Sequence, residues 1–90
     1  MKSVRWDPEK NEKLKRERGV AFEEIVFHIE RGDVIDITEH PNQVKYPGQQ
    51  IYIIRMHDYI YLVPFVETDD EIFLKTIIPS RKAEKEYRHE

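Results

Sequence analysis

The C-terminal end of this chain carries positively charged side chains whose spacing suits the binding of a phosphodiester. An apolar pattern typical of a strand covers residues 72–78 and contains one cation, Lys75, before a Pro-Ser pair interrupts it. We expect a short helix to follow. Its residues that could do chemistry are Arg81, Lys82, Lys85 and Tyr87. Cations near the end of a strand, together with the first free N–H groups of a helix, can hold a phosphate.

These residues also have an ordinary structural interpretation. Cations on a short terminal helix commonly form a solvated surface. Tyr87 could anchor the helix to a sheet, or it could stack on a base or donate a proton. The spacing alone leaves both interpretations open.

Arg55 is a further candidate, because it interrupts the apolar strand pattern that begins at residue 51. An arginine in such a strand must face solvent, pair with an acid or hold a ligand. If the uncovered face of the sheet binds RNA, we expect Arg55 to lie there. A cross-strand pair with Glu67 or Glu71 is the alternative.

A basic helix near the N-terminus supplies two more candidates, Lys15 and Arg18. They could contact phosphate groups, each contact adding salt-dependent affinity. Glutamates interleave with these cations at positions 9, 12 and 17, so a solvated surface held by i, i+3 and i, i+4 pairs is the alternative.

Histidines offer no metal-binding pattern. None of the four is spaced i, i+4 from another, which is how two histidines on a helix bind one metal ion. We therefore expect neither a metal site nor a cofactor. His28 lies beside the apolar face of a helix and is expected to be structural, whereas His57 and Asp58 suit the tip of a hairpin.

The size and composition of the chain restrict its class. Ninety residues make a single domain over 1–90, and the absence of cysteine excludes disulfides and thiolate metal sites. No apolar run approaches the roughly 18 residues of a membrane span, so we expect a soluble, cytoplasmic protein without membrane contact.

Charge is distributed unevenly. The net charge is −3, yet residues 1–19 contain seven Lys and Arg against four Asp and Glu, and residues 75–90 contain five against three. The middle, residues 20–74, contains three against eleven. Two basic ends could attract a polyanion, and the acidic middle could attract a basic partner or keep the protein soluble.

Turn and capping signals predict the N-terminal half. A strand is expected at 4–6, followed by a helix that Asp7 and a proline begin and a glycine ends. A second helix is expected up to Gly32, with apolar residues at i, i+3, i+4 and i+7 on one face. Its cap position holds Ala21, and the missing side-chain cap should cost about 1 kcal/mol.

The C-terminal half predicts strands. One covers 34–38, a loop covers 39–50, and three antiparallel strands share residues 51–78. Strand 59–66 is apolar on both faces and should be central, and Pro64 implies a bulge or an unpaired position in it. We therefore predict an α+β fold with two N-terminal helices and a C-terminal helix packed on one face of a mainly antiparallel sheet of four to five strands.

Four segments in this order resemble the BrnT family of bacterial type II toxins. They are WDPEKN at 6–11, RGVAFEEIV at 18–26, the three-stranded run, and IIPSRKAEKEY at 77–87. The resemblance spans nearly the whole chain. It implies a RelE-like fold and a ribonuclease that cleaves mRNA, held inactive by a small DNA-binding antitoxin, expected to be of the ribbon-helix-helix type, with which it forms an oligomer.

The resemblance also implies roles for the candidate residues. Metal-independent cleavage by the RNA 2′-hydroxyl needs a base, stabilisation of a charged phosphorane, and protonation of the leaving oxygen. RelE-like nucleases use Arg, Lys and Tyr for this. We expect Arg81 and Lys82 to stabilise the phosphorane, Lys75 and Arg55 to position phosphates, and Tyr87 to donate a proton or stack. The expected RNA-binding residues are Arg55, Lys85, Lys15 and Arg18.

A non-catalytic interaction module of the same fold, which binds an antitoxin or a regulator, is the alternative function. Where family members commonly carry Lys-His before the helix-ending glycine, this chain has Glu17 and Arg18. That difference and the acidic middle of the chain favour the alternative.

Overall fold

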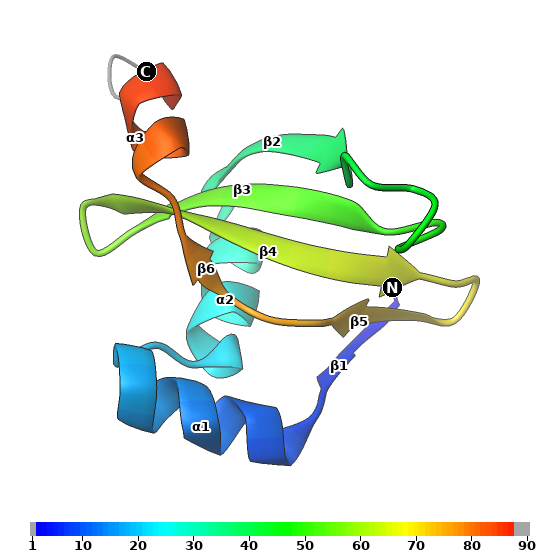
Figure 1. The fold of residues 1–90 in the computed structure, drawn as a ribbon. Helices are drawn as coiled ribbons and strands as arrows, with labels where there is room; N and C mark the ends of the chain where they lie inside the picture. The colour runs from blue at the N-terminus through cyan, green and yellow to red at the C-terminus, as the bar shows by residue number, and fades with distance from the viewer. Residues whose placement is uncertain (1, 88–90) are drawn as a thin grey trace.

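The computed structural model describes residues 2–87, except for the side chain of Tyr87, and shows an α+β arrangement of three helices and a mixed sheet. Figure 1 shows the arrangement along the chain. The elements are β1 (Ser3–Trp6), α1 (Pro8–Arg18), α2 (Phe22–Arg31), β2 (Val34–Glu39), β3 (Gln50–Met56), β4 (Tyr59–Glu67), β5 (Glu71–Leu74), β6 (Ile78–Pro79) and α3 (Arg81–Tyr87). Within residues 2–87, no helix combines the length and apolar character that crossing a membrane requires.

The sheet has the order β1-β5-β4-β3-β2, and the short β6 pairs with β4. β1 runs parallel to β5, whereas the other pairs are antiparallel. The α+β class and the mainly antiparallel character of the sheet are therefore confirmed. The central place of β4 is confirmed too, because β3 lies along one edge of it and β5 and β6 lie along the other.

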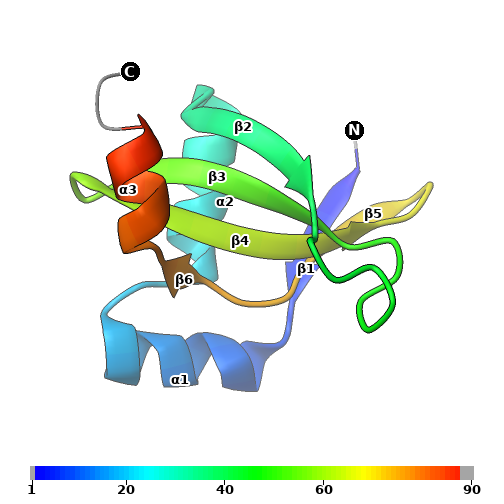
Figure 2. The same cartoon turned by 45° about the horizontal axis from the view of Figure 1, so that its top comes forward.

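The helices cover both faces of the sheet, so the prediction of helices on one face is wrong. Side chains alternate between the faces of a strand, and directly paired residues share a face. Tyr52 and Ile54 of β3 pack with α1 and α2, whereas Ile51 and Ile53 pack with Ala83 of α3. Figure 2 shows α3 in front of the sheet and α2 behind it.

The main core lies between the sheet and the two N-terminal helices. Burying these side chains is the largest favourable contribution to folding. Phe65 stacks on Tyr52, with ring centroids 4.0 Å apart, and Phe22 stacks on Trp6 at 5.8 Å. The largest fully buried side chains are Phe22, Phe65, Ile25, Ile54, Met56, Ile60, Leu74, Ile77, Val20 and Val63.

Pro64 interrupts the edge of β4 that faces β5 and β6. Its carbonyl accepts a hydrogen bond from the Lys75 N–H (2.8 Å), but its nitrogen has no hydrogen to donate on that side. Leu74 pairs with Phe65 and Ile78 pairs with Leu62, so residues 75–77 lie opposite only residues 63–64. The predicted bulge is confirmed, and it divides the expected strand 72–78 into β5 and β6.

The predicted helix signals are confirmed in α1. Asp7 accepts a hydrogen bond from the Glu9 N–H (2.9 Å), proline occupies the first turn, and Gly19 ends the helix with φ of 66°. Such a positive φ costs glycine little but strains residues with a Cβ.

Asn11 supplies the cap that α2 lacks in its own sequence. Ala21 has no polar side chain, and Glu24 accepts a hydrogen bond from the Ala21 N–H (3.0 Å). Asn11 of α1 is only 3 % exposed, and its Oδ1 accepts from the Phe22 N–H (2.8 Å) while its Nδ2 donates to Glu23 (2.8 Å). The first turn of α2 is therefore satisfied from a neighbouring helix, which offsets the predicted cost of Ala21.

We expect Asn11→Ala to lower the free energy of unfolding by about 2 to 3 kcal/mol, because it leaves the buried Phe22 N–H without an acceptor. Urea denaturation measures the change. Lys13→Ala, at an exposed position of the same helix, is the control and should stay within about 0.5 kcal/mol. Equal effects of the two substitutions would contradict the capping role.

The same contact gives stability a small dependence on pH. The hydrogen bond from Asn11 is the main cause that lowers the pKa of Glu23 below its ordinary 4.5, and its own backbone N–H and Lys15 act in the same direction. A lowered carboxyl pKa contributes stability above pH 4.5 that is lost as the pH falls. Glu23→Gln should therefore flatten the acid limb of the stability profile, by less than about 1 kcal/mol because the side chain is exposed.

Candidate functional site

The start of α3 is positioned by Ser80, a residue to which the sequence analysis gave no role. Its N–H donates to the carbonyl of Ile60 in β4 (3.1 Å), and its Oγ accepts from the Ala83 N–H (3.1 Å). This is the geometry of an N-cap, and serine three residues before the capped amide was the available signal. Because Ser80 occupies that amide and α3 has only seven residues, a phosphate here would be held by side chains rather than by the helix end.

Lys82 lines a hollow of about 250 Å³ between α3 and the sheet. Ile51, Ile53 and Leu62 form its floor, and its polar lining residues are Thr38, Ser80, Lys82 and Glu86. Within residues 2–87, Lys82 makes no recorded ion pair. Its side chain is exposed and lines the hollow, so its ammonium group can reach an anion bound there.

Lys75 lines a separate hollow of about 330 Å³ on the same face of the sheet. It follows Leu74, which points into the main core, so its side chain lies on the α3 face, with Nζ 5.3 Å from the centre of the Phe73 ring. Pro64 and Ile78 also line this hollow, with the loop residues His40, Tyr46 and Gln49.

The two hollows are neighbours rather than one site. Ile78 in the Lys75 hollow pairs with Leu62 in the Lys82 hollow, so they lie side by side along β4. The structure therefore places Lys75 and Lys82 on one face, but it does not direct them at one point. Together we call these hollows the α3-face groove.

The remaining predicted C-terminal residues are less defined. Arg81 and Lys85 are exposed on α3, and neither makes a recorded ion pair within residues 2–87. The side chain of Tyr87 lies outside the described part of the chain, so its predicted role stays a prediction.

Arg55 lies on the α3 face at one end of the sheet, and not on an uncovered face as expected, because helices pack on both faces. It pairs directly with Ile60, whereas Glu67 lies at the far end of β4 and pairs with Ile72 of β5. At about 3.3 Å per residue these ends are more than 20 Å apart, so the alternative pair with Glu67 or Glu71 is wrong. Arg55 lines a different hollow from the two lysines.

Lys15 and Arg18, the two predicted RNA-binding cations of α1, both contact groups of the protein itself. Lys15 contacts Glu12 at 3.1 Å and Glu23 at 3.9 Å, and the hydrogen bond to Glu12 is the main cause that raises the pKa of Lys15. Arg18 donates from Nη1 to the carbonyl of Ile77 (2.5 Å). The i, i+3 pair predicted for this helix is confirmed for Lys15.

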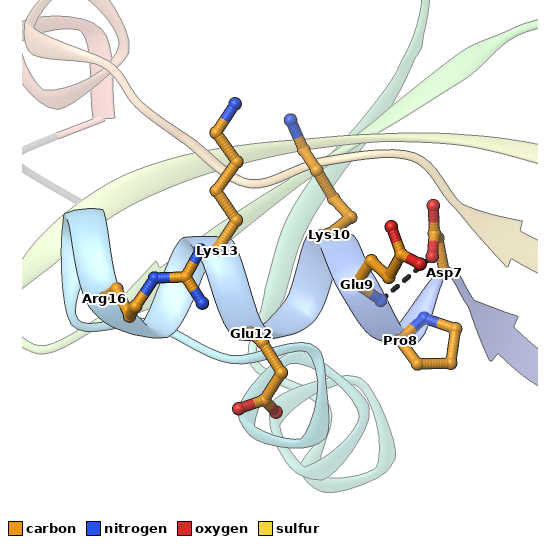
Figure 3. Close-up of a pocket in the computed structure, with 7 residues that line it drawn as sticks. All are labelled: Asp7, Pro8, Glu9, Lys10, Glu12, Lys13 and Arg16. Atoms are coloured by element: carbon orange, nitrogen blue, oxygen red, sulfur yellow. Dashed lines mark hydrogen bonds between the residues drawn. The ribbon is translucent and has the colours of Figure 1, made fainter.

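Other cations of α1 project from its surface. Figure 3 shows Lys10 and Lys13 extending to one side of the helix and Glu12 to the other, around a shallow hollow that Arg16 also lines. None of these three cations makes a recorded ion pair within residues 2–87. They are better placed than Lys15 and Arg18 to meet a phosphate.

Comparison of the chain with protein-family models, with curated proteins and with solved structures found no match.

Arg18→Ala should lower the free energy of unfolding by about 1.5 to 3 kcal/mol, because the Ile77 carbonyl would lose a charged donor. Urea denaturation provides the measurement. Arg16→Ala removes an exposed cation two residues away and should change stability by less than about 0.5 kcal/mol. If Arg18→Ala left stability unchanged, the bond to Ile77 would not hold α1 in place.

Proposed function

We propose that this protein is a metal-independent endoribonuclease that acts as the toxin of a bacterial type II toxin-antitoxin pair in the cytoplasm. The observation that carries the proposal is the α3-face groove, where Lys75 and Lys82 lie on one sheet face without recorded ion pairs in the described residues. The resemblance to the BrnT family, which implies a RelE-like fold, also supports the proposal. The neutralising partner would be a DNA-binding antitoxin that covers the same face.

The groove suits single-stranded RNA better than a compact anion. Its two lysines lie on separate segments, Lys75 opposite Pro64 between β5 and β6 and Lys82 on α3. A chain of phosphates requires such a spread of cations along its length. Tyr46 and His40 beside Lys75, with ring centroids 4.5 Å apart, offer faces on which a base could stack.

The main cellular test is expression of the protein alone in bacteria. We expect growth to stop and bulk mRNA to be cleaved, with products that end in 2′,3′-cyclic phosphate, as attack by the 2′-hydroxyl requires. Arg81→Ala, on an exposed side chain, should relieve toxicity while the far-ultraviolet circular dichroism spectrum stays unchanged. Normal growth with intact mRNA would overturn the proposal.

Binding gives a second test. Replacing Lys75 and Lys82 together with glutamine should reduce the slope of log K against log salt by roughly 1.4, at about 0.7 per lost phosphate contact with a single strand. Fluorescence anisotropy with a labelled RNA measures the slope. Lys15→Gln is the matched control and should leave it unchanged, because Glu12 and Glu23 already occupy that cation.

The alternative, a non-catalytic interaction module, is favoured by the internal contacts of Lys15 and Arg18, which remove two of the predicted RNA-binding cations. It predicts that the protein binds its partner but leaves RNA intact.

A further inference from the structure

One hollow at the hairpin end of the sheet is lined by several ionisable side chains from different elements. The hollow has a volume of about 400 Å³ and lies between the end of α2, the start of β2 and the β3–β4 hairpin. Val34, Ile35 and Met56 form its apolar part. Its ionisable lining residues are His28, Asp33, Arg55, His57 and Asp58.

A turn at the end of α2 holds His28 against Asp33. Gly32 has φ of 84°, which lets the chain fold back so that the Asp33 N–H donates to the His28 carbonyl (2.9 Å). His28 Nδ1 then lies 2.7 Å from Asp33 Oδ2, and Arg31 Nε contacts the same oxygen at 3.3 Å. A carboxylate only accepts hydrogen bonds, so Nδ1 carries the proton that faces Asp33, and Nε2 is the ring nitrogen that can take a proton from a substrate. This is the tautomer of a general base.

His57 occupies a position that costs backbone energy. His57 and Asp58 have φ of 56° and 58° and form the two-residue turn between the paired residues Met56 and Tyr59. Turns of this kind favour Asn-Gly, and residues with a Cβ at positive φ are strained, although histidine and aspartate tolerate it better than most. Backbone strain of this kind concentrates at functional sites.

Glu24 orients His57 from the first turn of α2. Its Oε2 lies 2.8 Å from His57 Nε2, and its Oε1 accepts from the Ala21 N–H. Because Nε2 faces this carboxylate, Nδ1 is the ring nitrogen of His57 that can donate a proton to a substrate. The two imidazoles are therefore held by different acids, and each keeps one ring nitrogen for a substrate.

We propose that this hollow is the acid–base centre of RNA cleavage, with His28 as general base, His57 as general acid and Arg55 as the group that stabilises the phosphorane. This inference rests on the ribonuclease function proposed above. Asp33 and Glu24 are positioning residues. The alternative, that both histidines only stabilise the fold through their carboxylate partners, makes different predictions below.

The reaction balances without a cofactor. His28 Nε2 takes the proton of the 2′-hydroxyl, and the 2′-oxygen forms a bond to phosphorus. The bond from phosphorus to the 5′-oxygen breaks, and His57 gives that oxygen its proton. The products are a 2′,3′-cyclic phosphate and a 5′-hydroxyl, with a proton moved from one histidine to the other.

The position of this hollow connects it to the α3-face groove. Arg55 lies directly opposite Ile60, whose carbonyl accepts the N–H of Ser80 at the start of α3. His28 and Glu24 belong to α2 on the opposite face, so a strand that leaves the groove past Arg81 and Lys82 would pass Arg55 and turn around the hairpin end of the sheet to meet the histidines. The groove would bind the chain, and the hollow would cut it.

The experiment measures single-turnover cleavage of a short oligonucleotide that contains one ribonucleotide. His28→Gln and His57→Gln should each slow cleavage by about 10² to 10⁴-fold. The charged groups around the imidazoles are Arg31 and Asp33 at His28, Glu24 at His57, and Arg55 and Asp58 in the hollow. The pH–rate profile should lose its acid limb in the first variant and its basic limb in the second.

A substrate that contains sulfur at the leaving group distinguishes a catalytic role of His57 from a structural one. Replacing the bridging 5′-oxygen with sulfur gives a leaving group that needs no proton. His57→Gln should then cleave at a rate within a few-fold of the unsubstituted protein, whereas His28→Gln should remain slow. His57 has a 52 % exposed side chain at a hairpin tip, so its replacement should leave the fold intact, which urea denaturation checks.

The outcomes separate the two proposals. If the unsubstituted protein cleaves RNA and both variants stay within threefold of it, the acid–base assignment is overturned and the ribonuclease function stands. If His57→Gln is equally slow on both substrates, the role of His57 as acid is overturned. If the unsubstituted protein leaves RNA intact, the ribonuclease function fails and the acid–base assignment fails with it.

Discussion

The arrangement of this molecule depends on how β4 is paired along the edge that Pro64 interrupts. A proline has no N–H, so a regular ladder cannot continue past it. The bulge at residues 75–77 shifts the register by one residue, and such a shift moves side chains to the other face of the sheet. Ile77 consequently enters the main core, and Ile78 pairs with Leu62 on the α3 face.

This bulge has consequences on both faces. The Ile77 carbonyl accepts from Arg18, which ties α1 to the interrupted edge. The chain then leaves β6 for the face opposite the two N-terminal helices, where Ser80 bonds to Ile60 and Ala83 packs on Ile51, Ile53 and Ile60. The position of Lys82 on the same face as Lys75 follows from the same irregularity.

Contacts between elements also explain where local reasoning from the sequence was incomplete. Ala21 is a poor cap for α2, but Asn11 of α1 accepts a hydrogen bond from the buried Phe22 N–H from outside the helix. Glu24 bonds the Ala21 N–H and also orients His57 from a distant hairpin. One carboxylate thus serves local helix stability and, in our proposal, catalysis. Lys15 and Arg18 have cationic side chains as expected, but their partners lie within the protein.

The sequence by itself determined the elements, because caps, glycines and apolar periodicity act over a few residues. It predicted α1 and α2, the central β4, the bulge at Pro64 and the hairpin tip at His57 and Asp58. Only the tertiary structure decided that α3 lies opposite α1 and α2, that Arg55 is far from Glu67, and that His28 and His57 line one hollow. These depend on strand register and on contacts between residues distant in the chain, and neither leaves a local pattern in the sequence.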